Sequence, residues 1–398
     1  MTWTTRREVL ALGAGAIVAA GRARAQTIPA KITDPVTIEF YNYNLASAGL
    51  GAQATREMLD AFKTANPNIV VNGVGVAWTQ IISRVQADIV AGRAPDVAQL
   101  VFSDLDFIIQ NLGVKPLEDI APPEEWREHA SGMVPAGLQP GALGGKIYGL
   151  AYTFSTPVLF YNATLFREAG LDPDKAPRNW AEVKQAALQI RDRAGKNGVY
   201  PAIYGAADWL YQSILLSNGG RMLSEDRKRL TFAEPAAVEA VQTMRDLVEN
   251  GSQPRINADE GADTFASGNL GMILTTSVNQ SSFVNASRDK FELRVAAMPA
   301  FGDKPTKPTN SGSALFILSS DPVKQRAAWE LVKHMTSKES YTIITSKIGY
   351  LPLRLDIVDD PRYLGEWVKA NPMVRPNLEQ LSRLTRWESM PGPNYRQI

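Results

Sequence analysis

The side chains of this sequence that are best suited to a functional site are aromatic and hydroxyl groups, which bind ligands, and not acids and bases. Of the eight tryptophans, Trp78 and Trp209 fall near predicted loop ends. A flat aromatic face combined with hydrogen-bonding groups suits sugars and polyols, whose apolar C–H faces are ringed by hydroxyls. Either ring could instead pack in the core. These residues therefore favour a ligand-binding site, with core packing as the alternative for each ring.

Residues for catalysis are scarce. The sequence has no cysteine and only two histidines, His129 and His334, which excludes thiolate nucleophiles and an imidazole-rich zinc site. We expect His129 on a charged surface helix, and His334 as a solvated residue of an amphipathic helix. No carboxylate pair is singled out for glycoside hydrolysis. We expect no enzymatic activity, no metal and no cofactor, and a secreted carbohydrate-active enzyme is the competing class.

Alternating strand and helix periods predict the elements that would position a site. Strands are expected at 36–43, 69–76 and 96–102, and helices at 52–65 and 79–91. This order predicts an α/β fold with an open sheet covered by helices. Ligands bind beyond the carboxyl ends of the strands in such sheets. The residues expected there are Tyr43, Asn44, Trp78, Phe102, Ser103 and Asp104.

Helix boundaries are marked more clearly in the second half of the chain. Asn179 and Glu182 predict a reciprocal capping box, and Gly195 ends the same helix. Asp321 followed by proline predicts the start of another helix. Residues 264–274 predict a helix end, a glycine turn and a buried strand. We expect these elements to serve as scaffold.

The first 25 residues predict an export signal. Arg6 and Arg7 precede an apolar run at 10–20, and a small-x-small cleavage site ends at Ala25. The paired arginines resemble a twin-arginine signal, and a general secretory signal is the alternative. Cleavage after Ala25 would leave the protein in the periplasm. Without cysteine it would carry neither disulfides nor a cysteine-linked lipid anchor.

Length and charge narrow the class of protein further. The 398 residues exceed the size at which a single core usually stops growing, so we expect two lobes. Removing the signal takes away four Arg and one Glu and leaves 38 basic and 40 acidic side chains. This near-neutral balance argues against a nucleic-acid or anionic-membrane partner.

Several motifs resemble one protein family. They are Ser155-Thr-Pro-Val-Leu-Phe-Tyr-Asn162, Pro177-Arg-Asn-Trp180, the Phe265-x-x-Gly-x-x-x-Met272 spacing, Gly349-Tyr350-Leu351-Pro352 and Met390-Pro-Gly-Pro-Asn-Tyr-Arg396. Their order resembles extracellular solute-binding protein family 1, whose members deliver sugars and polyols to ABC importers. Within that family the sequence is most similar to the periplasmic sn-glycerol-3-phosphate binding proteins.

The resemblance implies a two-lobe periplasmic binding protein fold of type II, like maltose-binding protein, with a hinge and an interlobe ligand cleft. Lobe 1 is expected to comprise 27–153 and 309–339, and lobe 2 is expected to comprise 154–308 and 340–398. The chain would cross between lobes near 152–156, 309–313 and 337–341. A monomer that delivers a carbohydrate or polyol to ABC permease subunits follows from the same resemblance.

The resemblance also nominates binding residues. Ser155, Tyr350 and Arg396 match ligand-contacting positions of the family motifs, and Gly312 matches a glycine whose backbone N–H could approach an anion. The stretch from Thr275 to Ser277 occupies the place of a ligand-binding serine, and Thr276 and Ser277 are the candidates in it. The alternatives are that Ser155 caps a turn, that Tyr350 packs beside Pro352, and that Arg396 is a solvated residue near the chain end, where family members continue with further helix.

Two departures from the family pattern bear on the ligand. Trp78 and Phe102 stand where the glycerol-phosphate proteins place a tyrosine and a hydroxyl-binding glutamate. Aromatic walls favour a ligand with a larger apolar or cationic part. We expect a glycerol-phosphate-like ligand, a glycerophosphodiester or an anionic sugar. A neutral oligosaccharide is the alternative, and a sensory protein that presents its ligand to a receptor is a further one.

Overall fold

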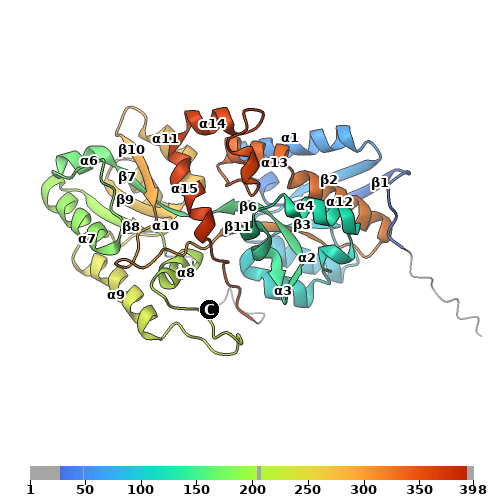
Figure 1. The fold of residues 1–398 in the computed structure, drawn as a ribbon, viewed down its shortest axis with the longest axis horizontal. Coiled ribbons are helices and arrows are strands. Elements are labelled where there is room, and N and C mark those ends of the chain that lie inside the picture. Colours follow the sequence, from blue (N-terminus) through green and yellow to red (C-terminus); the bar gives the residue numbers. More distant parts are fainter. Residues whose placement is uncertain (1–26, 48, 204–207, 392–398) are drawn as a thin grey trace, which may run out of the picture.

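The computed structural model describes residues 27–47, 49–203 and 208–391. These residues form two lobes side by side, each built around its own sheet (Figure 1). The first sheet has the strand order β2-β1-β3-β11-β6. Its strands are β1 (Val36–Asn42), β2 (Ile69–Gly75), β3 (Val97–Val101), β6 (Gly149–Ser155) and β11 (Ser311–Ile317). Strand β1 pairs in parallel with β2 and β3, whereas β11 runs antiparallel to β3 and β6.

The second sheet has the strand order β10-β7-β9-β8. Its strands are β7 (Pro157–Asn162), β8 (Asn197–Pro201), β9 (Leu270–Thr276) and β10 (Leu293–Ala297). Strand β9 pairs in parallel with β8 and antiparallel with β7. A small hairpin of β4 (Ala142–Leu143) and β5 (Lys146–Ile147) stands apart from both sheets.

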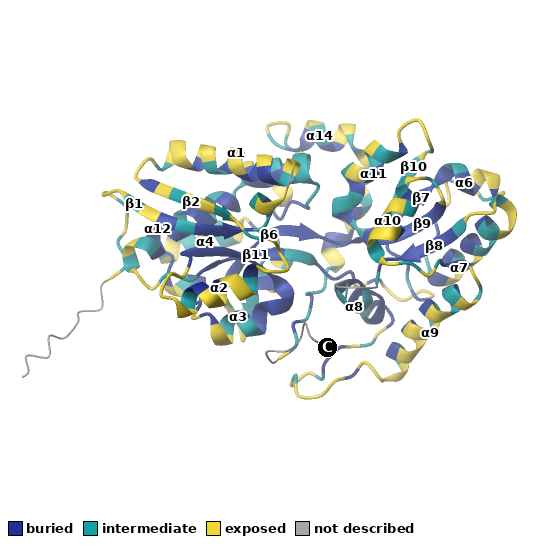
Figure 2. Cartoon of the chain, turned by 180° about the vertical axis from the view of Figure 1, so that it is seen from behind, coloured by how far each residue is buried: buried dark blue, intermediate teal, exposed yellow. Residues whose placement is uncertain are grey.

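Helices cover both sheets and turn their exposed faces outward (Figure 2). Those that the first half of the chain contributes are α1 (Leu50–Ala65), α2 (Ile81–Val90), α3 (Leu105–Asn111), α4 (Pro123–Ser131), α5 (Pro135–Leu138), α6 (Ala163–Glu168) and α7 (Trp180–Gln189). The second half contributes α8 (Asp208–Ser217), α9 (Pro235–Glu249), α10 (Ala258–Ala266), α11 (Gln280–Ser287), α12 (Pro322–Met335), α13 (Lys338–Ile343), α14 (Gly365–Ala370) and α15 (Arg375–Gln380). Among these described helices, none is both long and apolar enough to cross a membrane.

Local sequence signals account for most element boundaries. The expected strands and helices of the first hundred residues form within one or two residues of their predicted ranges. Met58 and Phe62 are fully buried one turn apart on α1, as an amphipathic helix requires. Asn162 caps α6, and Asp321 caps α12 by accepting from two backbone N–H groups. Gly195 ends its helix with a left-handed φ of 65°.

One capping prediction needs correction. Asn179 does accept from the backbone N of Glu182, but the Glu182 carboxylate accepts from the backbone N of Arg178, one residue before the expected partner. A complete reciprocal capping box forms instead at Asn257 and Glu260, at the start of α10.

The chain passes between the lobes at a buried residue. Strand β6 ends at Ser155 in the first sheet and β7 begins at Pro157 in the second, so Thr156 is the link. Thr156 is fully buried, and its hydroxyl donates to Asn377 Oδ1 over 2.7 Å. The position agrees with the expected crossing at 152–156. Strand β11, which starts at Ser311, then returns the chain to the first sheet.

The contacts of residues 341–354 favour a later position for the lobe boundary predicted near 340. The Tyr341 hydroxyl donates to Ala151 O in β6, Lys347 pairs with Glu57 in α1, and Arg354 donates to Thr336 O. Helix α15, in contrast, packs against β7 and β10. These contacts favour a third crossing between 358 and 374. The lobe limits 27–153 with 309–339 and 154–308 with 340–398 stay predictions.

Both histidines are more enclosed than expected. His129 lies at the end of α4 between Thr336, whose hydroxyl is 2.7 Å from Nε2, and Arg354. Burial, followed by the charges of Arg354 and Lys333, lowers the pKa of His129 to about 3. His334 contacts Met58 O, and burial lowers its pKa as well. His129 does lie on a charged surface helix, as expected, since no residue of α4 is buried. His334 is not the solvated residue that was expected, because its ring contacts the backbone of α1.

The lowered pKa values of the two histidines predict that the free energy of unfolding falls in mild acid. The folded chain keeps His129 neutral, whereas the unfolded chain binds a proton below its usual pKa of 6.5. Stability is therefore complete above pH 6.5 and falls as the pH drops toward 3. We expect the free energy of unfolding in urea to fall by roughly 1 to 2 kcal/mol from pH 6.5 to 5. His129→Gln should flatten this part of the curve, and an unchanged slope in that variant would contradict the assignment.

Candidate ligand-binding cavity

A cavity of about 270 Å³ lies between the lobes, at the ends of strands from both sheets. Five aromatic side chains line it: Tyr43, Trp78, Trp209, Tyr350 and Trp387. The remaining lining residues are small or hydroxylated, apart from two valines: Val101, Ser155, Thr276, Val278, Ser311 and Gly312. Strand ends position most of these residues, since Tyr43 follows β1, Val101 ends β3, Ser155 ends β6 and Thr276 ends β9.

The structure brings six of the predicted site residues to this cavity, namely Trp78, Ser155, Trp209, Thr276, Gly312 and Tyr350. Phe102 is fully buried and packs edge-on against Phe154, with 6.4 Å between the ring centroids. Ser103 is buried outside the cavity lining. The Ser277 hydroxyl accepts from Thr156 N instead of facing the cavity. Arg396 lies outside the described residues, and the binding roles of all ten residues stay predictions.

A buried hydroxyl network fixes the lobe 1 wall. The Tyr43 hydroxyl lies 2.8 Å from Thr153 Oγ1 and donates to Ser313 Oγ over 3.1 Å. Gln99 Nε2 also donates to Ser313 Oγ, over 2.9 Å. Burial raises the pKa of Tyr43 and that of Tyr350, so both phenols remain protonated at neutral pH. The wall therefore presents neutral hydrogen-bonding groups in a fixed geometry.

Hydroxyls from the two lobes meet at the floor of the cavity. Thr276 Oγ1, at the end of β9, donates to Ser155 Oγ, at the end of β6, over 2.9 Å. Ser311, the first residue of β11, is the register partner of Ser155. Because a hydroxyl both donates and accepts, this group can reorient toward a ligand hydroxyl without a change of charge.

Gly312 holds the cavity edge through its backbone. Its φ is 121°, and a Cβ atom there would lie 2.0 Å from the carbonyl oxygen of Thr153. Gly312→Ala must therefore push β11 away from β6. We expect a loss of about 1 to 3 kcal/mol in the free energy of unfolding.

A matched control for Gly312→Ala is Gly302→Ala. Gly302 also has a positive φ, of 57°, but a Cβ atom added there would meet only open space. It should show only the smaller cost of a left-handed alanine. Equal losses for the two variants in urea unfolding would show that the clash with Thr153 is not the cause.

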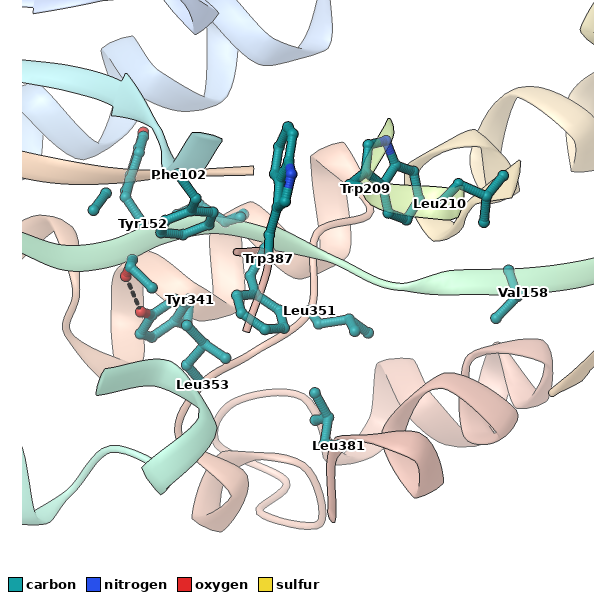
Figure 3. Packing of buried hydrophobic residues seen from close by; sticks show 14 of the residues in the cluster. Phe102, Tyr152, Val158, Trp209, Leu210, Tyr341, Leu351, Leu353, Leu381 and Trp387 are labelled. Atoms are coloured by element: carbon teal, nitrogen blue, oxygen red, sulfur yellow. Dashed lines mark hydrogen bonds between the residues drawn. The ribbon is translucent and has the colours of Figure 1, made fainter. Parts of the chain in front are cut away.

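Sequence reasoning named four of the five aromatic lining residues and missed Trp387; it also did not name Val101, Val278 and Ser311. Trp387 is 7% exposed and belongs to a segment without helix or strand periodicity, beyond α15. An isolated parallel bridge between Thr309 and Thr385 places this segment beside the start of β11. Figure 3 shows the indoles of Trp387 and Trp209 close to one another. The nearest sequence signal was the motif that begins at Met390.

The charge of the lining limits its chemistry. Every described side chain that lines the cavity is uncharged at neutral pH. Within the described residues, no group of three or more histidines or carboxylates is placed to hold a metal ion. The arrangement can stack on flat apolar faces and exchange hydrogen bonds with hydroxyls.

Comparison with known proteins identifies the class. The model of a family described as bacterial extracellular solute-binding protein matches residues 57–376. The chain belongs to this family. This solute-binding protein is 26% identical over 305 residues to a binding protein of Brucella abortus (strain 2308). The alignment covers 75% of this chain and 72% of the relative. It is 24% identical over 277 residues to the sn-glycerol-3-phosphate-binding periplasmic protein UgpB of Pectobacterium atrosepticum, across 66% of this chain and 61% of that relative.

Solved structures show that the solute-binding protein has the two-lobe fold of maltose-binding proteins. A cyclic α-maltosyl-1,6-maltose binding protein from Arthrobacter globiformis superposes with a TM-score of 0.78 at 24% identity, covering 91% of this chain and 90% of its own. UgpB from Mycobacterium tuberculosis, solved in complex with glycerophosphocholine, also has a TM-score of 0.78, at 21% identity over 92% and 91% of the two chains. These likenesses confirm the predicted fold class, and the match to the family model confirms the predicted family.

Proposed function

We propose that this solute-binding protein is the periplasmic component of an ABC importer and captures a small neutral carbohydrate between its lobes. The observation that carries the proposal is the cavity itself, in which three indoles and two phenols surround hydroxyls and no described lining side chain is charged. A sugar offers apolar C–H faces to such rings and hydroxyls to the polar rim. The cavity of about 270 Å³ is near the low end of ligand pockets, which supports a small ligand.

A glycerophosphodiester with a quaternary ammonium group is the second candidate. Aromatic side chains arranged around a site can bind a quaternary cation through their π faces. The likeness to a UgpB solved with glycerophosphocholine favours the same candidate. A phosphate group, however, calls for a cationic partner, and the described lining supplies none. Arg396 would have to provide it, so sn-glycerol 3-phosphate and anionic sugars are less well supported than a neutral ligand.

Transport requires a change of shape that a permease can recognise. In the proposed cycle the open lobes admit the ligand, closure removes water from the rings and hydroxyls, and the closed monomer docks on permease subunits. Membership of a solute-binding family supports this role over that of an enzyme. Turnover of a glycoside by the purified protein would favour the enzyme alternative, and binding to a receptor in place of a permease would favour a sensory role.

A thermal-shift panel tests the proposed ligand class. Neutral mono- to trisaccharides are compared with sn-glycerol 3-phosphate, glycerophosphocholine and a phosphorylated sugar. A ligand at 100 times its Kd adds about 2.7 kcal/mol of stability, so we expect at least one neutral saccharide to raise the unfolding midpoint by about 5 °C. A rise with only the phosphate-containing compounds would overturn the neutral-ligand proposal.

A further inference from the structure

The segment that carries Trp387 is fixed by hydrogen bonds on either side of the indole. On its N-terminal side, Thr385 N donates to Pro308 O over 2.8 Å, just before β11. On its C-terminal side, Glu388 N donates to Gln212 Oε1 over 3.0 Å, and Gln212 Nε2 returns a bond of 3.1 Å to Glu388 O. Gln212 is fully buried in α8. The backbone around Trp387 is therefore fixed although it forms neither helix nor strand.

Two hydrogen bonds hold Trp387, one from its backbone N and one from its indole ring. Its backbone N donates to Asn310 Oδ1 over 2.9 Å. Its ring Nε1 donates to Asp208 Oδ2, also over 2.9 Å. Asp208 is the first residue of α8, where the helix dipole favours a negative charge. A bond from an N–H to a carboxylate is stronger than one between neutral groups.

We propose that Asp208 positions the Trp387 indole as a fixed wall of the cavity, and that Trp387 thereby selects ligands with a flat apolar face. Trp387 lines the cavity together with Trp209, the residue next to Asp208. The Asp208 carboxylate thus fixes the position of the Trp387 indole relative to the Trp209 indole. The ligand class in this inference rests on the proposed function. The placement of the Trp387 ring does not.

Orientation of the indole matters because its N–H needs a partner. A buried donor left unpaired costs about 1 to 3 kcal/mol, so Trp387 without Asp208 would tend to turn its N–H toward the cavity or toward water. Either movement replaces an ordered apolar face with a mobile or polar one. A wall ordered before the ligand arrives removes part of the entropic cost of binding.

Fluorine spectra test the positioning without a ligand. In protein labelled with 5-fluorotryptophan, the Trp387 resonance is identified by its loss in Trp387→Phe. We expect Asp208→Ala to shift and broaden this resonance, and Asp208→Asn, which keeps an acceptor oxygen, to restore most of the wild-type line. The Trp180 resonance, from α7, should stay in place. An unmoved Trp387 resonance in Asp208→Ala would overturn the inference.

A double-mutant cycle tests selection, with maltose as the calorimetric probe. Asp208→Ala should raise the Kd about tenfold in the wild-type background, but less than twofold when Trp387 is already phenylalanine, since no indole N–H remains to be held. Equal losses in both backgrounds would show that Asp208 acts by another route and would overturn the inference. If the wild type binds neither maltose nor any other neutral saccharide, the proposed function fails, while the fluorine spectrum still decides the positioning of Trp387.

Discussion

Replacement of Trp209 by alanine is expected to raise the Kd for a bound neutral saccharide by about 30-fold or more, the effect of losing 2 kcal/mol at a binding hot spot. Trp209 is 7% exposed at the start of α8 and lines the cavity with Trp387. The substitution removes an aromatic face that water cannot replace and leaves an enlarged cavity. Isothermal titration calorimetry with the best saccharide from the thermal-shift panel measures the change.

Trp180 provides the matched control for Trp209. It is 4% exposed in α7, packs at 6.2 Å from Phe301 and lies outside the cavity lining. Trp180→Phe should lower thermal stability while leaving the Kd within about twofold of wild type. If Trp209→Ala and Trp180→Phe weakened binding equally, the loss would reflect lobe 2 stability and not contact with the ligand.

Arg227→Ala is expected to lower the free energy of unfolding by about 2 kcal/mol and to enlarge the unliganded particle. Arg227, in the connection between α8 and α9, donates to Asp106 in α3 over 2.7 Å and to Ser389 O over 2.9 Å. The Asp106 side chain is 5% exposed, so removal of the guanidinium leaves a carboxylate buried without its cation. We set the cost below that of a fully buried pair because Arg227 is 23% exposed.

The Arg227 contact joins the second-lobe connection to a first-lobe helix, so its loss should also free the lobes to separate. Urea unfolding and small-angle X-ray scattering measure the two effects. Arg229→Ala is the matched control, because Arg229 lies in the same connection and pairs with Glu234 where both side chains are about half exposed or more. It should change neither measurement appreciably. An Arg227→Ala variant that behaves like Arg229→Ala would contradict the interlobe role of this ion pair.

The fold could be predicted because its signals are local. Alternation of apolar residues located β1 and β2, and single side chains such as Asn179 and Asp321 marked helix starts. Once the order of strands and helices is known, the sheet ends that face a ligand follow from topology. Trp78, Ser155 and the other cavity residues named from the sequence were found in this way or through motifs.

Side-chain direction at the strand ends could not be predicted. All five residues of β3 are buried, so alternation gives no sign of which face Phe102 occupies, and it packs against Phe154. Thr276 and Ser277 are adjacent hydroxyls, yet one contacts Ser155 and the other contacts the crossing residue Thr156. The choice depends on how β9 ends, which the sequence does not encode in any period.

Long-range contacts account for the remaining differences. Trp387 reaches the cavity through bonds to Asn310 and Asp208, 77 and 179 positions away along the chain. His129 is enclosed by Arg354, 225 positions away. No local pattern indicates such pairings, because they arise only after the lobes and the last segment have packed.

The most direct test of the central claim is a crystal structure of the protein with the saccharide that the thermal-shift panel selects. The ligand is predicted to lie between the lobes, with its ring faces against Trp209 and Trp387 and its hydroxyls within hydrogen-bond distance of Ser155 or Thr276. A ligand bound elsewhere on the molecule, or one held in this cavity through a phosphate and a cationic side chain, would contradict the account.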